Sequence, residues 1–273
     1  MKAQNIATYE LGHGDEESLI LDLSRKGVYS FLIGGMKVDA YIVARPFSKS
    51  ILWCGQSAIT AAGRENLPLF HRLTWEESFT SSFVTFNDPT LYLYKDLLGG
   101  WSQGVPGDFG IRAIYRVVNA IKVNINRRAR SVYYGSSAGG FWALMTAALD
   151  KAPCMVEIPQ TDMFSYPWTR HREALFARCY RDHGLSPDAY PDRLRVSDWF
   201  KKIGAMPERI LYHQSSRDYD HIETQMKPFQ AEMNAFGYQG LNVEIYDLPE
   251  TASGHSPRNK GESVARLREL LQE

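Results

Sequence analysis

The stretch that decides the fold prediction is Tyr-Tyr-Gly-Ser-Ser-Ala-Gly-Gly-Phe-Trp-Ala-Leu, residues 133–144. Its centre follows the pattern Gly-x-Ser-x-Gly, with Ser137 between Gly135 and Gly139. The apolar run before it predicts a strand, and the run after it is rich in good helix formers. A serine at such a sharp strand-to-helix turn is typical of a nucleophile elbow.

The two glycines have a physical reason in this interpretation. The turn forces the serine into a strained backbone conformation, and side chains two residues away on either side would collide. A phosphate-binding loop would need a lysine after the glycines, and a dinucleotide-binding turn would need the spacing G-x-G-x-x-G; neither is present. A tight packing turn without a catalytic role remains an alternative.

A serine nucleophile needs a base, and the base needs an orienting acid. Asp218 and Asp220 follow a predicted strand at residues 208–214, and His255 follows the last predicted strand, residues 242–249. This order of serine, acid and histidine is the order of an α/β-hydrolase sheet. We favour Asp218 as the acid, because Asp220 is suited to capping the next helix.

The oxyanion of such a reaction needs backbone N–H donors. We expect the N–H of Ala138 to be one, and Gln56, in the loop after the strand that ends at Cys54, to be the second. Asp-Tyr-Asp-His, residues 218–221, contains metal-ligand residue types, but no second cluster completes a shell, so no metal site is expected.

Strand and helix patterns alternate from about residue 50 onward, which predicts a parallel sheet with helices on both faces. A hairpin around Gly34-Gly35 and a strand at residues 18–23 are predicted before it. We therefore expect a single α/β domain over residues 1–273. Residues 163–207 interrupt the alternation with many aromatic residues and arginines, and they are expected to form a lid inserted over the sheet.

The composition excludes several classes of function. The chain has 273 residues, 44% hydrophobic, with 31 basic and 31 acidic side chains, so no nucleic-acid partner is expected. No apolar segment is long enough to span a membrane, and the polar N-terminal residues do not resemble a secretion signal. Three cysteines without CxxC spacing favour free thiols and a cytoplasmic location. The oligomeric state is left open.

The chain resembles the α/β-hydrolase superfamily over about residues 28–273. The matching motifs are YYGSSAGG, QSSRDYDH and SGHSP, and the resemblance implies Ser137 as nucleophile, Asp218 as acid and His255 as base. FNDPTLYL, GGW and PQTD also look similar to bacterial capsule-polymer O-acetyltransferases and to glycan-modifying proteins of accessory secretion systems. Unlike common lipases, the chain has no HGGG-type stretch after Cys54.

These observations predict a serine-dependent acyl-transfer enzyme that hydrolyses or transfers an O-acyl ester without a bound cofactor. One alternative is an O-acetyltransferase that uses acetyl-CoA as donor and a bacterial surface polysaccharide as acceptor. Another is a non-catalytic binding module on the same fold. The substrate is then a small ester or a glycan, and Trp101 and Trp168 are candidates for stacking on sugar faces, unless they belong to the lid core.

Overall fold

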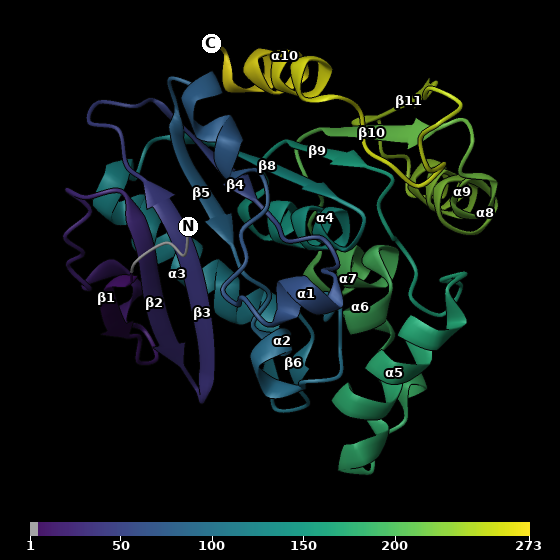
Figure 1. Cartoon of the computed structure of the whole chain (residues 1–273), viewed down its shortest axis with the longest axis horizontal. Coiled ribbons are helices and arrows are strands. Elements are labelled where there is room, and N and C mark those ends of the chain that lie inside the picture. Colours follow the sequence, from purple (N-terminus) through teal and green to yellow (C-terminus); the bar gives the residue numbers. More distant parts are fainter. Residues whose placement is uncertain (1–4) are drawn as a thin grey trace.

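A central sheet of nine strands organises the computed structural model, which describes residues 5–273 (Figure 1). The strand order is β1-β2-β3-β5-β4-β8-β9-β10-β11. All neighbouring pairs are parallel except that β3 runs antiparallel to β2 and β5. The strands are β1 (Asn5–Glu10), β2 (Gly27–Ile33), β3 (Met36–Val43), β4 (Ser50–Cys54), β5 (Ser82–Phe86), β8 (Arg130–Ser136), β9 (Cys154–Glu157), β10 (Ile210–Ser215) and β11 (Leu241–Tyr246).

Helices cover both faces of this sheet, as the alternation predicts. On one face, α10 packs against the strands, and on the other lie α3, α4 and α7 (Figure 1). A small hairpin, β6 (Gly104–Val105) and β7 (Asp108–Phe109), precedes α3. The helices are α1 (Ala61–Arg64), α2 (Thr90–Leu93), α3 (Gly110–Asn126), α4 (Ala138–Asp150), α5 (Thr169–Cys179), α6 (Pro191–Leu194), α7 (Val196–Ile203), α8 (Tyr219–His221), α9 (Lys227–Ala235) and α10 (Lys260–Leu271).

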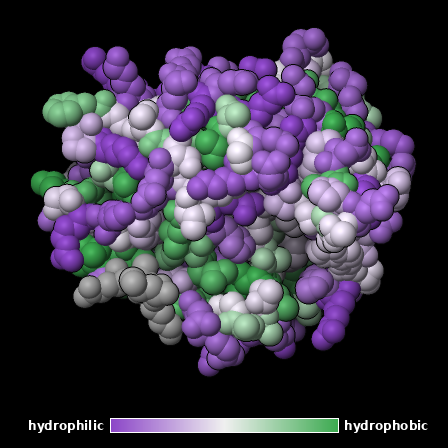
Figure 2. Space-filling view, turned by 45° about the horizontal axis from the view of Figure 1, so that its top comes forward, coloured by the Kyte–Doolittle hydropathy of each residue, from purple (hydrophilic) through white to green (hydrophobic). Residues whose placement is uncertain are grey.

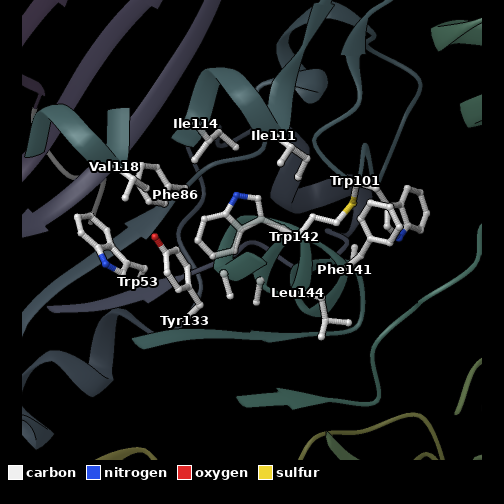
Figure 3. Close-up of a cluster of buried hydrophobic side chains, with 14 of the residues drawn as sticks. Trp53, Phe86, Trp101, Ile111, Ile114, Val118, Tyr133, Phe141, Trp142 and Leu144 are labelled. Atoms are coloured by element: carbon white, nitrogen blue, oxygen red, sulfur yellow. The ribbon is translucent and has the colours of Figure 1, made fainter. Parts of the chain in front are cut away.

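The central strands are buried on both sides, which explains why their sequences are continuously apolar. Successive side chains of a strand point to opposite faces, so Trp53 of β4 faces α3 and α4, whereas Leu52 faces α10. Figure 3 shows the core on the face covered by α3 and α4: Trp142 of α4 lies in its middle, with Tyr133 and Phe86 on one side. On the outside, hydrophilic residues cover most of the face in Figure 2.

The N-terminal part differs from the sequence prediction in one respect. The hairpin is confirmed, with Gly34 and Gly35 both at positive φ (53° and 85°). Residues 18–23, however, form no strand, and β1 takes the edge position instead, parallel to β2. The reason is that Asn124 of α3 binds this backbone: its side chain accepts from the Leu21 N–H (2.9 Å) and donates to the Leu19 carbonyl (2.8 Å).

The segment expected to form a lid lies between β9 and β10 and carries α5, α6 and α7. Its helix α7 packs on α4, where the Trp199 indole N–H donates to the Met145 carbonyl (3.0 Å). Helix α5 lies farther from the sheet (Figure 1). Within residues 5–273, no helix is both long and apolar enough to cross a membrane.

Candidate active site

Ser137 occupies the sharp turn between β8 and α4. Its backbone has φ 54° and ψ −123°, a conformation that costs a non-glycine residue about 1–3 kcal/mol. A Cβ atom on Gly135 would collide with the Gly139 carbonyl, so the turn requires glycine at that position. The strand, turn and helix therefore have the geometry that the sequence predicts for a nucleophile elbow.

Three predicted residues come together at the carboxyl ends of parallel strands. His255, in the loop after β11, places Nε2 2.9 Å from Ser137 Oγ. Its Nδ1 lies 2.6 Å from Oδ2 of Asp218, which follows β10. Asp220 is exposed, whereas Asp218 is buried beside His255. The role of Asp218 as the acid stays a prediction. The arrangement is that of a Ser-His-Asp triad.

A second histidine binds the same carboxylate. Nδ1 of His221 lies 2.9 Å from Asp218 Oδ1, and the ring centroids of His221 and His255 are 4.2 Å apart. His221 is fully buried. The two carboxylate oxygens of Asp218 thus accept hydrogen bonds from two different histidines. The sequence analysis did not predict the contact of His221, although this residue lies only three positions after Asp218.

Gln160, after β9, joins this second histidine to the nucleophile. Its Nε2 lies 3.1 Å from Ser137 Oγ and 3.3 Å from His221 Nε2, and its Oε1 accepts from the Trp101 indole N–H (3.1 Å). The fixed indole donor sets the orientation of the amide. The amide therefore donates to His221 Nε2, which leaves the proton of His221 on Nδ1, facing Asp218. A closed hydrogen-bond circuit runs from Ser137 through both histidines and back.

Electrostatics favour the protonation states that the triad needs. Burial alone raises the pKa of Asp218, but hydrogen bonds from His221 and His255 outweigh it and hold that pKa well below its usual range. Burial lowers the pKa of His255 below its usual 6.5, and the hydrogen bond to Asp218 opposes this only in part. Asp218 is therefore ionised and His255 neutral at neutral pH, ready to accept a proton.

A pocket of about 310 Å³ opens directly onto this triad. Ser137, His255 and Trp168 form part of its wall, together with Arg72 and Ser57. Trp168 is 42% exposed, and its ring lies edge-to-face against His255 with centroids 4.8 Å apart. This tryptophan, from the beginning of the segment 163–207, is thus exposed at the pocket beside His255, and its role in substrate binding stays a prediction.

The other predicted tryptophan requires a correction. Trp101 is only 2% exposed and packs in the core, edge-to-face against Tyr166 (centroids 5.4 Å apart). A sugar ring has no access to it, and its N–H is used by Gln160. Trp101 therefore supports the site from behind and does not stack on a sugar face. Sequence alone could not distinguish these two positions, because burial depends on residues far away in the chain.

The two predicted oxyanion donors lie beside each other. Ala138 is the first residue of α4, where backbone N–H groups have no partner within the helix. The backbone of Gln56 passes close to Gly139, because a Cβ atom added to Gly139 would lie 3.1 Å from the carbonyl carbon of Gln56. The Gln56 side chain binds the Leu69 carbonyl (2.7 Å) and the Asp88 N–H (2.5 Å) and so fixes this loop. Their donor role stays a prediction.

Asp218, His221 and His255 also form a set of metal-ligand types, with candidate ligand atoms within 4.8 Å of one another. Both carboxylate oxygens of Asp218 are hydrogen-bonded to the two histidines, and His255 also contacts Ser137. A metal ion would have to replace the hydrogen bonds that link acid, base and serine. We therefore interpret the cluster as a triad with an additional histidine.

Solved structures confirm the fold. The chain is similar to the capsule O-acetyltransferase of Neisseria meningitidis serogroup A, with 14% identity and a TM-score of 0.66 over 93% of this chain and 97% of that one. A variant of that enzyme has been solved in complex with CoA. An S-formylglutathione hydrolase from Agrobacterium tumefaciens gives 17% identity and a TM-score of 0.57 over 90% of this chain and 94% of that one.

A third similar structure is the glycosylation-associated Gap123 complex of Streptococcus agalactiae. It gives 13% identity and a TM-score of 0.59 over 88% of this chain and 45% of that chain. No protein-family model and no curated protein sequence matches the chain. At these identities the comparisons show the fold alone: the protein has the α/β-hydrolase fold, as its sequence motifs predict.

Proposed function

We propose that this protein is a serine-dependent acyl-transfer enzyme that acts on an O-acyl ester through a covalent acyl-enzyme. One observation carries the proposal: Ser137 Oγ, the His255 imidazole and the Asp218 carboxylate lie in one hydrogen-bonded line, with the serine in a strained elbow. The fold likeness to esterase-type hydrolases and to an O-acetyltransferase supports the same general chemistry.

Acylation follows from the geometry. His255 Nε2 takes the proton of Ser137 Oγ as this oxygen attacks the ester carbonyl carbon. Asp218 holds the imidazole in the required tautomer and stabilises its positive charge. The negative carbonyl oxygen is bound by the N–H groups of Ala138 and Gln56. When the tetrahedral intermediate collapses, the ester C–O bond breaks and His255 returns the proton to the leaving alcohol.

Deacylation uses the same groups with a new nucleophile. His255 takes a proton from water or from a sugar hydroxyl, whose oxygen attacks the acyl carbon. The bond from this carbon to Ser137 Oγ then breaks, and His255 returns the proton to Oγ. The Gln160 amide, 3.1 Å from that oxygen, donates a hydrogen bond to it. Charge that develops on Oγ in either direction is therefore stabilised by a neutral, fixed donor.

An O-acetyltransferase is the second candidate. The capsule O-acetyltransferase matches almost the whole length of this chain, and a variant of it binds CoA. In this version acetyl-CoA acylates Ser137 as a co-substrate, and a polysaccharide hydroxyl accepts the acetyl group beside the exposed ring of Trp168. A cytoplasmic location fits both versions, because Cys54, Cys154 and Cys179 are buried free thiols.

The first test is the pre-steady-state burst of p-nitrophenol from p-nitrophenyl acetate. We expect a burst in the wild type, and in Ser137→Ala neither a burst nor more than about 0.1% of the steady-state rate. Ser131→Ala is the matched control, since this serine lies in the same strand and its hydroxyl has no hydrogen-bond partner among the described residues. A burst that persists in Ser137→Ala would remove the serine as nucleophile.

A second measurement separates the two candidates. The enzyme is incubated with acetyl-CoA in the presence and absence of capsular polysaccharide, and CoA release and sugar acetylation are followed. A transferase releases about one equivalent of CoA per enzyme without the acceptor, continues to release CoA only when the acceptor is present, and leaves acetyl ester on the sugar. A hydrolase leaves no acetyl ester on the sugar and turns over p-nitrophenyl acetate at the same rate whether or not sugar is present.

A further inference from the structure

Arg72 lies in the wall of the active-site pocket but has no part in the mechanism above. Its backbone has φ 67°, in the left-handed region that non-glycine residues rarely adopt. Its guanidinium lies over the ring of Trp75 (4.8 Å to the centroid) and beside the ring of Tyr134 (5.7 Å). A strained backbone and two aromatic rings therefore hold this cation at the pocket.

The charge of Arg72 has no direct counter-ion. Among the described residues, no carboxylate lies within 4 Å of its guanidinium. Its hydrogen bonds go to neutral hydroxyls, from Nε to Tyr134 (3.4 Å) and from Nη2 to Ser136 Oγ (3.1 Å). Within residues 5–273, Nη1 has no acceptor. The cation thus keeps hydrogen-bond donors for another group.

The acid that attracts Arg72, Glu157, lies on the far side of the Tyr134 hydroxyl. Glu157 is fully buried and accepts from the Tyr134 hydroxyl (2.5 Å) and from Ser263 Oγ (2.8 Å). The Tyr134 hydroxyl therefore lies between Glu157 and Arg72, and the pocket side of the guanidinium has no negative charge next to it. In a site of low polarity, such a cation is stabilised when an anion binds to it.

The other groups at this wall are donors or neutral. Burial and the charge of Arg72 lower the pKa of His71 to about 4, so His71 is neutral, and its Nδ1 accepts from the Ser57 N–H (3.0 Å). The hydroxyls of Ser57 and Ser136 lie 2.9 Å apart beside it. No aspartate or glutamate lines this pocket in the described part of the chain. This wall of the pocket is therefore electropositive, and no acidic side chain among the described pocket residues neutralises it.

We infer that Arg72 recognises a negatively charged group, a carboxylate or a phosphate, on the ester that Ser137 attacks. The inference rests on the proposed acyl transfer and names its substrate class. The planar guanidinium fork suits such anions, and its partner Ser136 is the residue next to the nucleophile, so the anion lies close to the reacting carbonyl. The small pocket, about 310 Å³, limits this end of the substrate to a compact group.

The anion can belong to the acyl group or to the leaving group, and paired esters distinguish the two. The first pair is mono-p-nitrophenyl adipate and its neutral methyl ester; the second is 4-acetoxybenzoate and methyl 4-acetoxybenzoate. The measured quantity is kcat/KM for the charged ester divided by that for the neutral one, after subtraction of the uncatalysed rate. The pair that carries the effect identifies the side that faces Arg72.

We expect the wild type to favour the charged member of one pair, and Arg72→Gln to lower that ratio by about 10- to 100-fold. Arg72→Lys keeps the charge without the fork and restores the ratio only in part. Arg128→Gln, an exposed arginine far from the pocket, is the control for net charge and leaves the ratio as it is. Thermal unfolding of each variant checks that it folds.

A wild type that prefers the neutral member of both pairs would overturn the inference without any variant. An equal ratio in wild type and Arg72→Gln would do the same. If the wild type turned over no ester at all, the proposed function would fail separately. Calorimetric binding of 4-hydroxybenzoate and adipate, against their methyl esters, then decides the anion site: tighter binding of the anions that is lost in Arg72→Gln supports it, and no difference excludes it.

Discussion

At the scale of single residues, the unusual feature is that one carboxylate serves two histidines. In a simple triad the acid orients only the base, whereas here Asp218 also accepts from His221, which is fully buried. The second hydrogen bond fixes the plane of the carboxylate and reduces its basicity. His221 is thus a positioning residue: it acts on the reaction through Asp218 and through its ring contact with His255.

This arrangement predicts a shift of the pH profile. His255 must be neutral to accept the Ser137 proton, and its pKa is lowered, so kcat/KM falls only as the pH drops below about 6.5. In His221→Leu the N–H donor to Asp218 Oδ1 is lost, so the carboxylate becomes more basic and stabilises the charged form of His255 more strongly. The pKa of His255 therefore rises and the acidic limb moves to higher pH.

The magnitude and the controls follow from the same contacts. We expect kcat in His221→Leu to fall by about 10- to 100-fold, because Asp218 loses the hydrogen bond that His221 donates to Oδ1. His221→Asn keeps an N–H donor for Asp218 and should restore part of the rate, while His13→Leu, at an exposed histidine, tests for a general effect. An unchanged acidic limb in His221→Leu would show that His221 is only a packing residue.

At the scale of elements, the strand-to-helix turn depends on close contact between two backbone segments. Gly135 at the end of β8 lies against the Gly139 carbonyl in the first turn of α4. A methyl group at Gly135 cannot be accommodated by a side-chain rotation, because the opposing atoms belong to the backbone. The helix would have to move away from the strand, and it would carry Ser137 and Ala138 with it.

We therefore expect Gly135→Ala to lower both stability and activity. Overpacking of this kind costs about 1–3 kcal/mol in the free energy of unfolding. The displaced nucleophile should lower kcat by about 100-fold. Thermal unfolding and p-nitrophenyl acetate kinetics measure the two effects. Gly107→Ala is the control, since a Cβ at Gly107 meets no atom within 4 Å. Equal stability and activity in the two variants would contradict this account of the elbow.

At the scale of the whole molecule, the segment at residues 163–207 is tied to the sheet domain by a buried arginine. Arg193 donates to the carbonyls of Gln103 (2.6 Å), Val105 (3.0 Å) and Pro106 (2.8 Å). Its guanidinium also lies over the ring of Phe109 (4.5 Å to the centroid). We propose that this contact holds the segment, including Trp168, as a lid over the pocket.

Loss of this arginine should loosen the lid. In Arg193→Met three carbonyls lose a charged donor, so we expect the free energy of unfolding to fall by about 2–4 kcal/mol. Hydrogen exchange should increase mainly in residues 163–207. Arg181→Met removes an arginine of the same segment whose ion pair with Glu173 is half exposed, and such pairs contribute less than about 1 kcal/mol. Equal exchange in the two variants would argue against an anchoring role.

The sequence alone predicted the succession of strands and helices after residue 50, the sharp turn at Ser137, and Asp218 and His255 in the loops after two later strands. It could do so because these features depend on local patterns and on chain order, which the fold translates directly into place. The edge strand β1 was missed, since its position depends on pairing with β2 and on the hold of Asn124 on residues 19–21.

Only the tertiary structure decided which side chains complete the site. Gln160 contacts Ser137, His221 contacts Asp218 and Gln160, and Arg72 lies in the pocket wall, each from a different segment. Trp101, expected at a sugar face, is buried behind Gln160. The direction and burial of a side chain are set by packing against residues distant in the chain. Local patterns therefore predicted Ser137, Asp218 and His255, which the structure brings together, whereas long-range packing added a second histidine, an amide donor and a cation beside them.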